Sequence, residues 1–600
     1  MSAITGVKGS DCYSSTNSTL NDLWIQLNRG LKAETITAAV HSIMTNGSTQ
    51  DKIDLFVLAF QTRDIRGGKG ERNLFYTLWS LLATKEPNAA MATIKHIPTY
   101  GYWEDLNVLA HKTAPQHLVN SAILYTIAKQ ISSDYASLSI PDYKLSLVGR
   151  HAPREHNHKP EDKALAKTLA RLMFPGDKAA NKKYRMQVVA LSKALKVPEI
   201  AMSAKNWSSL DPTSMPGRCL KTKLKGLLNQ PVYSKYGRRT VLSDNDRVTC
   251  AATFASHLSK AKNGEAKVKG ADVVYPYELV AKVLKHLNSP ETVSRHDDTM
   301  ACSDDEDYNT YPQVPNPARL SPEELDAIEA QWRSIVDPIK ALGTLGSWLP
   351  MCDFSGSMEG NPMNNAMALG LIIAECNTGV FKDTILTFDS VPTLYKFTTT
   401  GLVNRVHEIR HLAQGLSTDF QAAYNLILTT LIDNAVPASM WPKYLLCLTD
   451  MNFDSAAGFG QYSSHTNTRH SKAVKTGDHE THMMIIRRSF SLQAQNLFGS
   501  NAPAPPICVC WNLTGGATDF QAQNTDYGVI QVSGWSPSLI KHLATRGIDA
   551  FNSEQILRSI LDDPRYDPVR VAVSSFLTPP QPLLPPSPPS ELEFDRALCN

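Results

Sequence analysis

Apolar residues in the first half of the chain recur at helical spacing. In "DKIDLFVLAFQTRDIRGGKGERNLFYTLWSLLA" (residues 51–83) they cluster around Leu55 and again around Leu78, with a Gly-Gly turn between the clusters. This spacing predicts two helices joined by a short turn. Residues 89–114, "AAMATIKHIPTYGYWEDLNVLAHKTA", repeat the pattern. Successive helix pairs predict a helical-repeat solenoid, which we assign to residues 41–290 after an N-terminal extension at 1–40.

Two segments lack this apolar pattern. Residues 291–320 are rich in acids, Pro, Asn and Ser, which predicts a linker. Residues 578–600 are Pro-rich, which predicts an extended or disordered tail. A helix is expected to start after the linker at "SPEELDAIEAQW", because Ser321 suits the cap and Pro322 the first turn.

The second half alternates short apolar runs with amphipathic stretches. The runs "GSWLPMCDF", "DTILTFDS", "WPKYLLCLTDM", "PPICVCWNL" and "YGVIQVSG" predict strands, and the stretches "NPMNNAMALGLIIAECN", "TDFQAAYNLILTTLIDNA" and "SPSLIKHLATRG" predict helices between them. Such alternation predicts a mostly parallel sheet with helices on both faces. We assign this α/β domain to residues 321–577, including an exposed, flexible loop at 456–478. Ligands in such folds bind at the carboxyl ends of the strands.

Composition adds three expectations. With 600 residues, the chain needs more than one hydrophobic core. No run of eighteen apolar residues occurs, so no membrane span is expected, and the N-terminus lacks the order of a secretory signal. Ten cysteines are scattered, and the spacing of Cys508 and Cys510 suits two side chains on one face of a strand better than a disulfide. These features predict an intracellular protein with reduced thiols.

One strand end carries three oxygen-bearing side chains at alternate positions. In "WLPMCDFSGSMEGNPM", Asp353 closes the apolar run and is followed by Ser355 and Ser357. One carboxylate and two hydroxyls that converge on a point are ligands for a hard divalent cation. The alternative is that Ser357 caps the next helix and that the acid is coincidental.

This motif resembles the metal-ion-dependent adhesion site ("DxSGSM") of von Willebrand A domains. The resemblance implies two further ligands, which order and context place at Thr418 in "GLSTDFQAAY" and at Asp450 in "LLCLTDMNFD". It also implies Mg2+ (or Mn2+ or Ca2+), with one coordination position left for a carboxylate of a protein partner. No nucleophile–base pair stands beside the motif, so we expect binding and not catalysis.

The helical half resembles the TROVE module of the Ro RNA-binding proteins, on the segments "RDIRGGKGERNLFY" and "IPTYGYWEDLNVLA". In those proteins a von Willebrand A domain also follows the repeats. "SLVGRHAPRE" and the later "DMNFD" and "CWNL" segments indicate a related uncharacterised (domain-of-unknown-function) family with that architecture. The resemblance implies an α plus α/β fold: a HEAT-like helical solenoid followed by a von Willebrand A-type doubly wound domain. Pro350 departs from it by interrupting the strand before Asp353.

Basic residues independently suggest RNA. Residues 201–272 contain 13 Lys and Arg against 5 Asp and Glu, an excess of 8, although the whole chain has a net charge of only +3. Basic and aromatic residues together suit a surface that follows phosphates and stacks bases. The alternative is a solvated face with local ion pairs. The candidate RNA-binding residues are Arg63, Arg66, Lys69, Arg72, Lys221, Lys223, Lys225, Arg238 and Arg239.

Histidines offer weaker metal candidates. His407 and His411 are four residues apart, as metal pairs on helices often are, but a solvated helix face explains them better. A polar stretch with four more histidines is interpreted as an exposed loop and not a zinc site. Those four are His465, His470, His479 and His482.

Three functions remain open. The first is a non-enzymatic ribonucleoprotein scaffold, in which the helical repeats hold RNA and the metal site holds a partner. The second is a protein-interaction module without specific RNA binding. The third is a structural protein that self-assembles, as in a virion or capsid. The location would be cytoplasmic, or a virion if the protein is viral.

Overall fold

The computed structural model of the protein describes residues 3–5, 11–156, 159–234, 237–239, 242–270, 274–294, 313–316, 318–387, 392–412, 420–452, 481–515, 519–546 and 552–578. The predicted loop at 456–478 and residues 579–600 of the predicted tail lie outside these ranges. Of the predicted linker, only the two ends are described, and they pair as the antiparallel strands β5 (Thr292–Ser294) and β6 (Gln313–Pro315).

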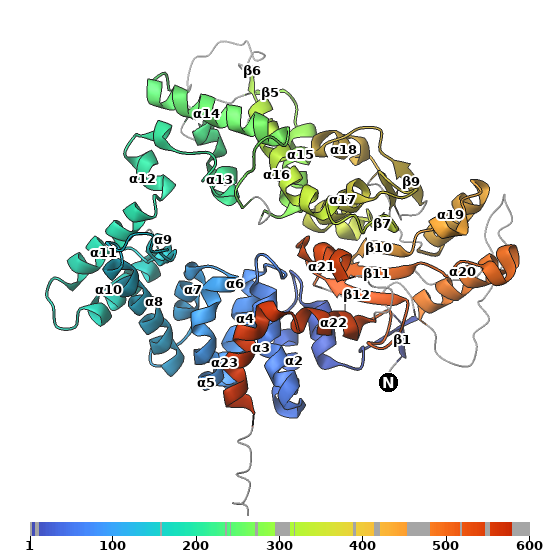
Figure 1. The fold of residues 1–600 in the computed structure, drawn as a ribbon, viewed down its shortest axis with the longest axis horizontal. Coiled ribbons are helices and arrows are strands. Elements are labelled where there is room, and N and C mark those ends of the chain that lie inside the picture. The colour runs from blue at the N-terminus through green and yellow to red at the C-terminus, as the bar shows by residue number, and fades with distance from the viewer. Residues whose placement is uncertain are drawn as a thin grey trace, which may run out of the picture.

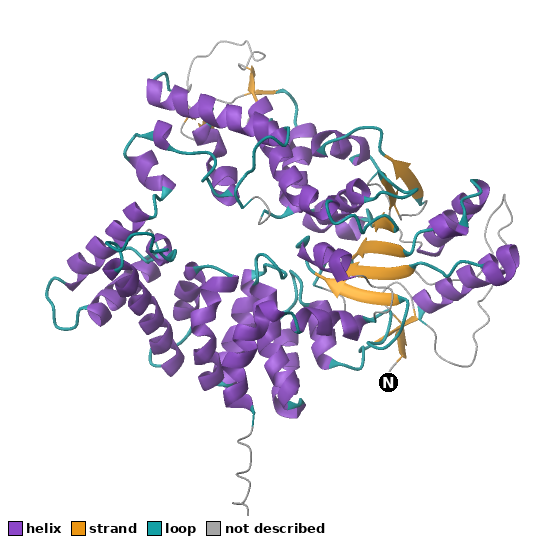
Figure 2. Ribbon diagram, viewed as in Figure 1, coloured by secondary structure: helices purple, strands orange, loops and turns teal. Residues whose placement is uncertain are grey.

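The first part of the chain is helical, as predicted (Figure 2). Its central helix is α3, which begins with a capping box formed by Ser48 and Asp51. Every residue of α3 from Ile53 to its end is buried, so the helix is enclosed on all sides. The helices of this part are α1 (Thr19–Gln26), α2 (Ala33–Asn46), α3 (Thr49–Arg63), α4 (Arg72–Lys85), α5 (Pro87–Thr93), α6 (Ile97–Tyr100), α7 (Trp103–Lys112), α8 (Leu118–Ala136), α9 (Val148–His151), α10 (Pro160–Met173), α11 (Ala180–Ala194) and α12 (Pro198–Ser203).

A second group of helices connects this part to the sheet. In it α14 packs against α16, and α15 packs against α17 and α18 of the α/β part. The helix predicted at Ser321 is confirmed, with Ser321 and Glu324 forming a capping box. The group contains α13 (Gly217–Leu227), α14 (Asn245–Lys262), α15 (Pro276–Leu287) and α16 (Pro322–Lys340), with the short strands β3 (Val232–Ser234) and β4 (Gly237–Arg239).

The α/β part is built on a six-stranded sheet in the order β12-β11-β10-β7-β8-β9. The first five strands in this order are parallel, and β9 pairs antiparallel at the edge. All five predicted strands are confirmed, and β9 was not predicted. The strands are β7 (Trp348–Cys352), β8 (Thr384–Thr387), β9 (Thr393–Lys396), β10 (Tyr444–Thr449), β11 (Ile507–Asn512) and β12 (Val529–Ser533).

Alternate residues of the strands supply two cores on opposite faces of the sheet. Leu446 and Val509 share the core of α17 and α21, whereas Leu445 and Cys508 share the core of α19 and α20. The predicted helices on both faces are therefore confirmed. The helices of this part are α17 (Asn361–Cys376), α18 (Leu402–Ile409), α19 (Phe420–Asp433), α20 (His482–Phe498) and α21 (Ser538–Arg546).

Pro350 lies within the central strand β7. It faces Leu446 in the pairing with β10, but β7 pairs with β8 only from Met351 onward. Because proline has no N–H to donate, the missing pairing on the β8 side agrees with its presence in a central strand.

Each end of the chain packs against the part of the structure formed by the other end of the sequence (Figure 1). At the start of the chain, β1 (Ala3–Thr5) pairs with β2 (Asp11–Tyr13), Tyr13 bridges to Phe520, and α1 packs against β12. At the end, α22 (Ser553–Leu561) and α23 (Asp567–Leu577) leave the sheet and pack against α3, and α23 also packs against α5. The helical part is thus completed by residues from the far end of the chain, which the sequence did not suggest.

The structure bears on two expectations from composition: the lack of a membrane span and the spacing of Cys508 and Cys510. In the described part of the chain, no helix is both long and apolar enough to span a membrane. Cys508 and Cys510 are buried free thiols whose sulfur atoms lie 3.6 Å apart on one strand, as their spacing predicted.

Candidate functional site

Two acidic residues meet at the carboxyl edge of the sheet. Asp353 directly follows β7 and Asp450 directly follows β10, and these strands are parallel neighbours with Cys352 opposite Leu448. Both acidic side chains are buried. Parallel pairing therefore brings together two of the predicted metal ligands.

The two serines lie in the turn between β7 and α17. Asp353 Oδ1 accepts a hydrogen bond from the Ser355 N–H at 2.9 Å, and the hydroxyl oxygens of Ser355 and Ser357 are 3.1 Å apart. Ser355 is buried and Ser357 is exposed, so the cluster has a buried base and an open rim. The alternative that Ser357 caps the next helix is wrong, because Gly360 occupies the N-cap of α17.

Electrostatics at this cluster favour a cation. Asp353 Oδ2 accepts a hydrogen bond from Thr449 Oγ1 at 2.8 Å. Burial, and then the charge of Asp450, raise the pKa of Asp353 to about 6. Two carboxylates that share poorly solvated space repel each other, and a divalent cation between them would remove this cost.

The donor set fits a hard divalent cation, since it consists of carboxylate and hydroxyl oxygens. Across the described ranges, no group of three or more His, Cys, Asp or Glu side chains is placed to hold a metal. A cation at Asp353 and Asp450 would therefore depend on the serine hydroxyls and on water. Thr418, the fifth predicted ligand, lies outside the described residues.

Two of the predicted RNA-binding residues lie in the interior. Arg63 donates from Nε and Nη2 to the buried carboxylate of Asp105, at 2.8 and 3.2 Å. Lys69 Nζ donates to the carbonyls of Trp24 and Leu27 and to Ser533 Oγ, at 2.5, 2.9 and 2.7 Å. Neither side chain is available to a phosphate on the surface, and we withdraw both from the candidate RNA-binding set.

The turn between α3 and α4, residues 63–71, is instead a structural junction. Besides the contacts of Arg63 and Lys69, its Asp64 accepts hydrogen bonds from Arg565 Nη2 at 2.8 Å and from the Tyr566 hydroxyl at 3.1 Å. Its Gly68 fits closely, because a Cβ there would lie 1.9 Å from the Gln61 carbonyl oxygen. The hydrogen bonds of Arg63, Asp64 and Lys69 therefore connect this one turn to α7, to segments near both ends of the chain and to β12. The sequence offered one signal for this structural role. Apolar residues on every side of α3 predict that the helix is enclosed, and a turn that follows directly from an enclosed helix is expected to be enclosed as well.

The other basic candidates differ in exposure. Arg66 and Lys223 are exposed, Arg72 is partly exposed, Lys221 pairs with Glu278, and Lys225 lies 4.0 Å from Glu324. Arg238 and Arg239 belong to β4, but their side chains lie outside the described set.

Of the histidine candidates, His407 and His411 are both exposed, which agrees with a solvated helix end. His465, His470 and His479 lie outside the described residues. His482 begins α20, and its side chain is not described.

Comparison with known proteins identifies the family. The family model with the description "Domain of unknown function (DUF2828)" matches residues 7–126 and 116–345, which together are more than half of the chain. The chain belongs to the DUF2828 family. This confirms the predicted membership of a domain-of-unknown-function family.

Two further findings accompany the DUF2828 match. A second family model, "Domain of unknown function (DUF7788)", matches residues 347–565, which contain the whole sheet and the Asp353 cluster. The chain is also similar to uncharacterized protein L728 of Acanthamoeba polyphaga mimivirus. The two are 22% identical over 583 residues, which cover 94% of this chain and 87% of the relative.

Proposed function

We propose that this protein is a non-enzymatic RNA-binding scaffold whose α/β part holds a divalent cation and, through it, an acidic group of a protein partner. The observation that carries the proposal is the meeting of Asp353 and Asp450 at adjacent strand ends, with the hydroxyls of Ser355 and Ser357 beside them. The cation would be Mg2+, Mn2+ or Ca2+. An ion on this cluster would retain open positions, because the five predicted ligands are fewer than the six that an octahedral ion requires.

The sheet topology supports a von Willebrand A-type domain. The strand order, with five parallel strands, an antiparallel edge and helices on both faces, is that of a doubly wound fold. In such folds ligands bind outside the carboxyl ends of the strands, where Asp353 lies. The successive packed helices from α2 to α11 support the HEAT-like, TROVE-like interpretation of the first part.

RNA binding is supported by the remaining exposed basic residues. Arg66 and Lys223 carry no side-chain hydrogen bond or ion pair among the described residues, and both are exposed. Free cations on a surface bind phosphates without reading sequence. They therefore suit the backbone of many RNAs.

The metal site is tested by calorimetry with Mg2+. Asp353→Ala should abolish Mg2+ binding while circular dichroism stays unchanged, because the residue ends a strand and contributes no apolar packing. Glu359→Gln is the matched control, since Glu359 is an exposed acid in the same loop. Unchanged Mg2+ affinity in Asp353→Ala would refute the site.

RNA binding is tested by filter retention across a salt series. The combined variant Arg66→Ala and Lys223→Ala should weaken binding to unrelated RNAs alike. It should also flatten the log–log salt slope by roughly 0.7 for each lost phosphate contact with a single strand. Asp353→Ala should retain full RNA affinity, because the metal site does not contribute to the contacts between basic side chains and RNA phosphates. The proposal fails if the wild-type protein retains no RNA near physiological salt.

An assembly role without RNA is the second candidate, and the similarity to a mimivirus protein favours it. Symmetric particles of the purified protein on electron micrographs, together with absence of RNA retention, would establish this alternative.

A further inference from the structure

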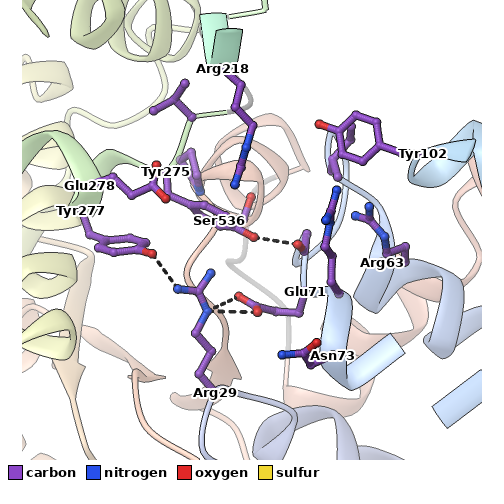
Figure 3. A pocket seen from close by; sticks show the side chains of 15 residues that line it. Arg29, Arg63, Glu71, Asn73, Tyr102, Arg218, Tyr275, Tyr277, Glu278 and Ser536 are labelled. Atoms are coloured by element: carbon purple, nitrogen blue, oxygen red, sulfur yellow. Dashed lines mark hydrogen bonds and ion pairs between the residues drawn. The ribbon is translucent and has the colours of Figure 1, made fainter. Parts of the chain in front are cut away.

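A cavity of about 290 Å³ lies where α4, α7, α13, the segment before α15 and the loop after β12 meet. Its lining is dominated by arginine and tyrosine side chains. Figure 3 shows Arg29, Arg63 and Arg218 extending toward this space from different elements, with Tyr102 and Tyr277 at its sides.

The carboxylates in the lining are already neutralised by protein groups. Glu71 accepts two hydrogen bonds from Arg29 Nε, at 2.9 and 3.0 Å. Glu278 pairs with Lys221. Of the four arginines in the lining, Arg63 and Arg72 also have acidic partners just outside it, so the positive charge that favours an anion comes from Arg218.

Two guanidinium groups are left for a ligand. Arg218, on α13, is exposed and makes no side-chain hydrogen bond or ion pair with any described residue. Arg72, on α4, pairs with Glu104 at 3.3 Å and lies 4.0 Å from Asp105, but it remains partly exposed. Arg63 is almost fully buried and bound to Asp105, so it shapes the wall of the cavity and is not itself a donor for the ligand.

Flat surfaces accompany these donors. The Tyr102 ring centre lies 5.3 Å from the Arg63 guanidinium carbon and 5.2 Å from that of Arg72. The Arg29 guanidinium carbon lies 5.3 Å from the Tyr277 ring centre and 4.2 Å from the Trp535 ring centre. Tyrosine rings and guanidinium planes are the surfaces on which nucleic-acid bases stack.

We propose that this cavity binds a single nucleotide, with its phosphate on Arg72 and Arg218 and its base against the tyrosine and guanidinium faces. The volume is near the lower end of ligand pockets, about 300–1,000 Å³, which admits one nucleotide unit and no folded RNA. The nucleotide is either free or the terminal unit of an RNA strand. Only the second form rests on the proposed RNA-binding function.

Calorimetry with adenosine 5′-monophosphate, ribose 5-phosphate and adenosine tests the proposal on the full chain. The monophosphate should bind most tightly and adenosine should not bind measurably. Arg218→Ala should weaken the monophosphate about tenfold or more, because hydrogen bonds to charged groups contribute about 1.5–3 kcal/mol. Arg218→Lys should recover part of the affinity, since it keeps the charge but loses the planar fork.

Lys223→Ala is the matched control for this site. Lys223 lies on the same helix, α13, and is exposed, but it does not line the cavity. Its removal should leave monophosphate binding unchanged while it weakens RNA retention. The inference is overturned if the wild type binds no monophosphate, if Arg218→Ala binds it as the parent does, or if ribose 5-phosphate binds equally well.

Competition separates the two sources of the nucleotide. Displacement of the bound monophosphate by a 5′-phosphorylated oligoribonucleotide, but not by its 5′-hydroxyl form, would assign the cavity to an RNA end. Displacement by neither would assign it to a free nucleotide. Both results support nucleotide binding in the cavity. If the filter assay shows no RNA retention, the proposed RNA-binding function fails, but nucleotide binding measured by calorimetry would still support this cavity as a binding site.

Discussion

Replacing Asp105 with alanine is expected to lower the free energy of unfolding by about 3–5 kcal/mol, the cost of leaving one member of a buried ion pair alone. Asp105 is fully buried and accepts hydrogen bonds from Arg63 Nε, from the Tyr76 hydroxyl and from the Tyr102 N–H. Its removal would leave the Arg63 guanidinium without a counter-charge in the interior. Urea unfolding followed by tryptophan fluorescence measures the change.

Glu104→Ala provides the comparison for this variant. Glu104 is the neighbouring acid, but it is only partly buried and pairs with the partly exposed Arg72 at 3.3 Å. Such surface pairs contribute about 0–1 kcal/mol. If Asp105→Ala costs no more than Glu104→Ala, the ion pair with Arg63 does not hold α3 to α7.

Lys69→Met is expected to produce the second large loss, about 3 kcal/mol or more, because three buried acceptors lose a donor and each buried polar group left unsatisfied costs about 1–3 kcal/mol. Methionine keeps most of the apolar stem, so the change isolates the donors. The lost partners are the carbonyls of Trp24 and Leu27 and the hydroxyl of Ser533. Hydrogen exchange should therefore increase in α1 and in β12 as well as around residue 69.

Lys262→Met is the matched control, since Lys262 is an exposed lysine paired with Asp326 at 2.7 Å. It should leave hydrogen exchange in α1 unchanged. Equal protection of α1 in the wild type and in Lys69→Met would show that Lys69 does not hold the start of the chain.

The α/β part could be predicted from the sequence because its signals are local. Each buried parallel strand appears as a short apolar run, and the turn after β7 carries Asp353, Ser355 and Ser357 within five residues. Asp450 could be added because strand ends of a parallel sheet share one edge. Among the described strands of the sheet, β9 was missed because its residues are exposed or half-buried and form no apolar run. The helix α20 was also not predicted.

The roles of Arg63 and Lys69 could not be predicted because their partners are distant in sequence. Arg63 pairs with Asp105, and Lys69 reaches Ser533 near the far end of the chain. A cluster of basic residues beside a glycine turn has the same composition whether its side chains face solvent or form buried hydrogen bonds. Composition alone therefore could not distinguish the two roles. The cavity was missed for the same reason: Arg29, Arg72 and Arg218 come from three separate segments that only the fold brings together.

The return of α22 and α23 to the first helices has a consequence for synthesis of the chain. Val569 and Val573 of α23 are fully buried, and the Tyr566 ring stacks on Tyr100 with 5.6 Å between centres. A ribosome releases α3 and α5 long before it adds these residues. The surface of α3 that α23 covers therefore stays uncovered until residues 567–577 have been synthesised, so the nascent chain exposes apolar surface while the sheet is being made and completes its first helical layer only after α23 emerges.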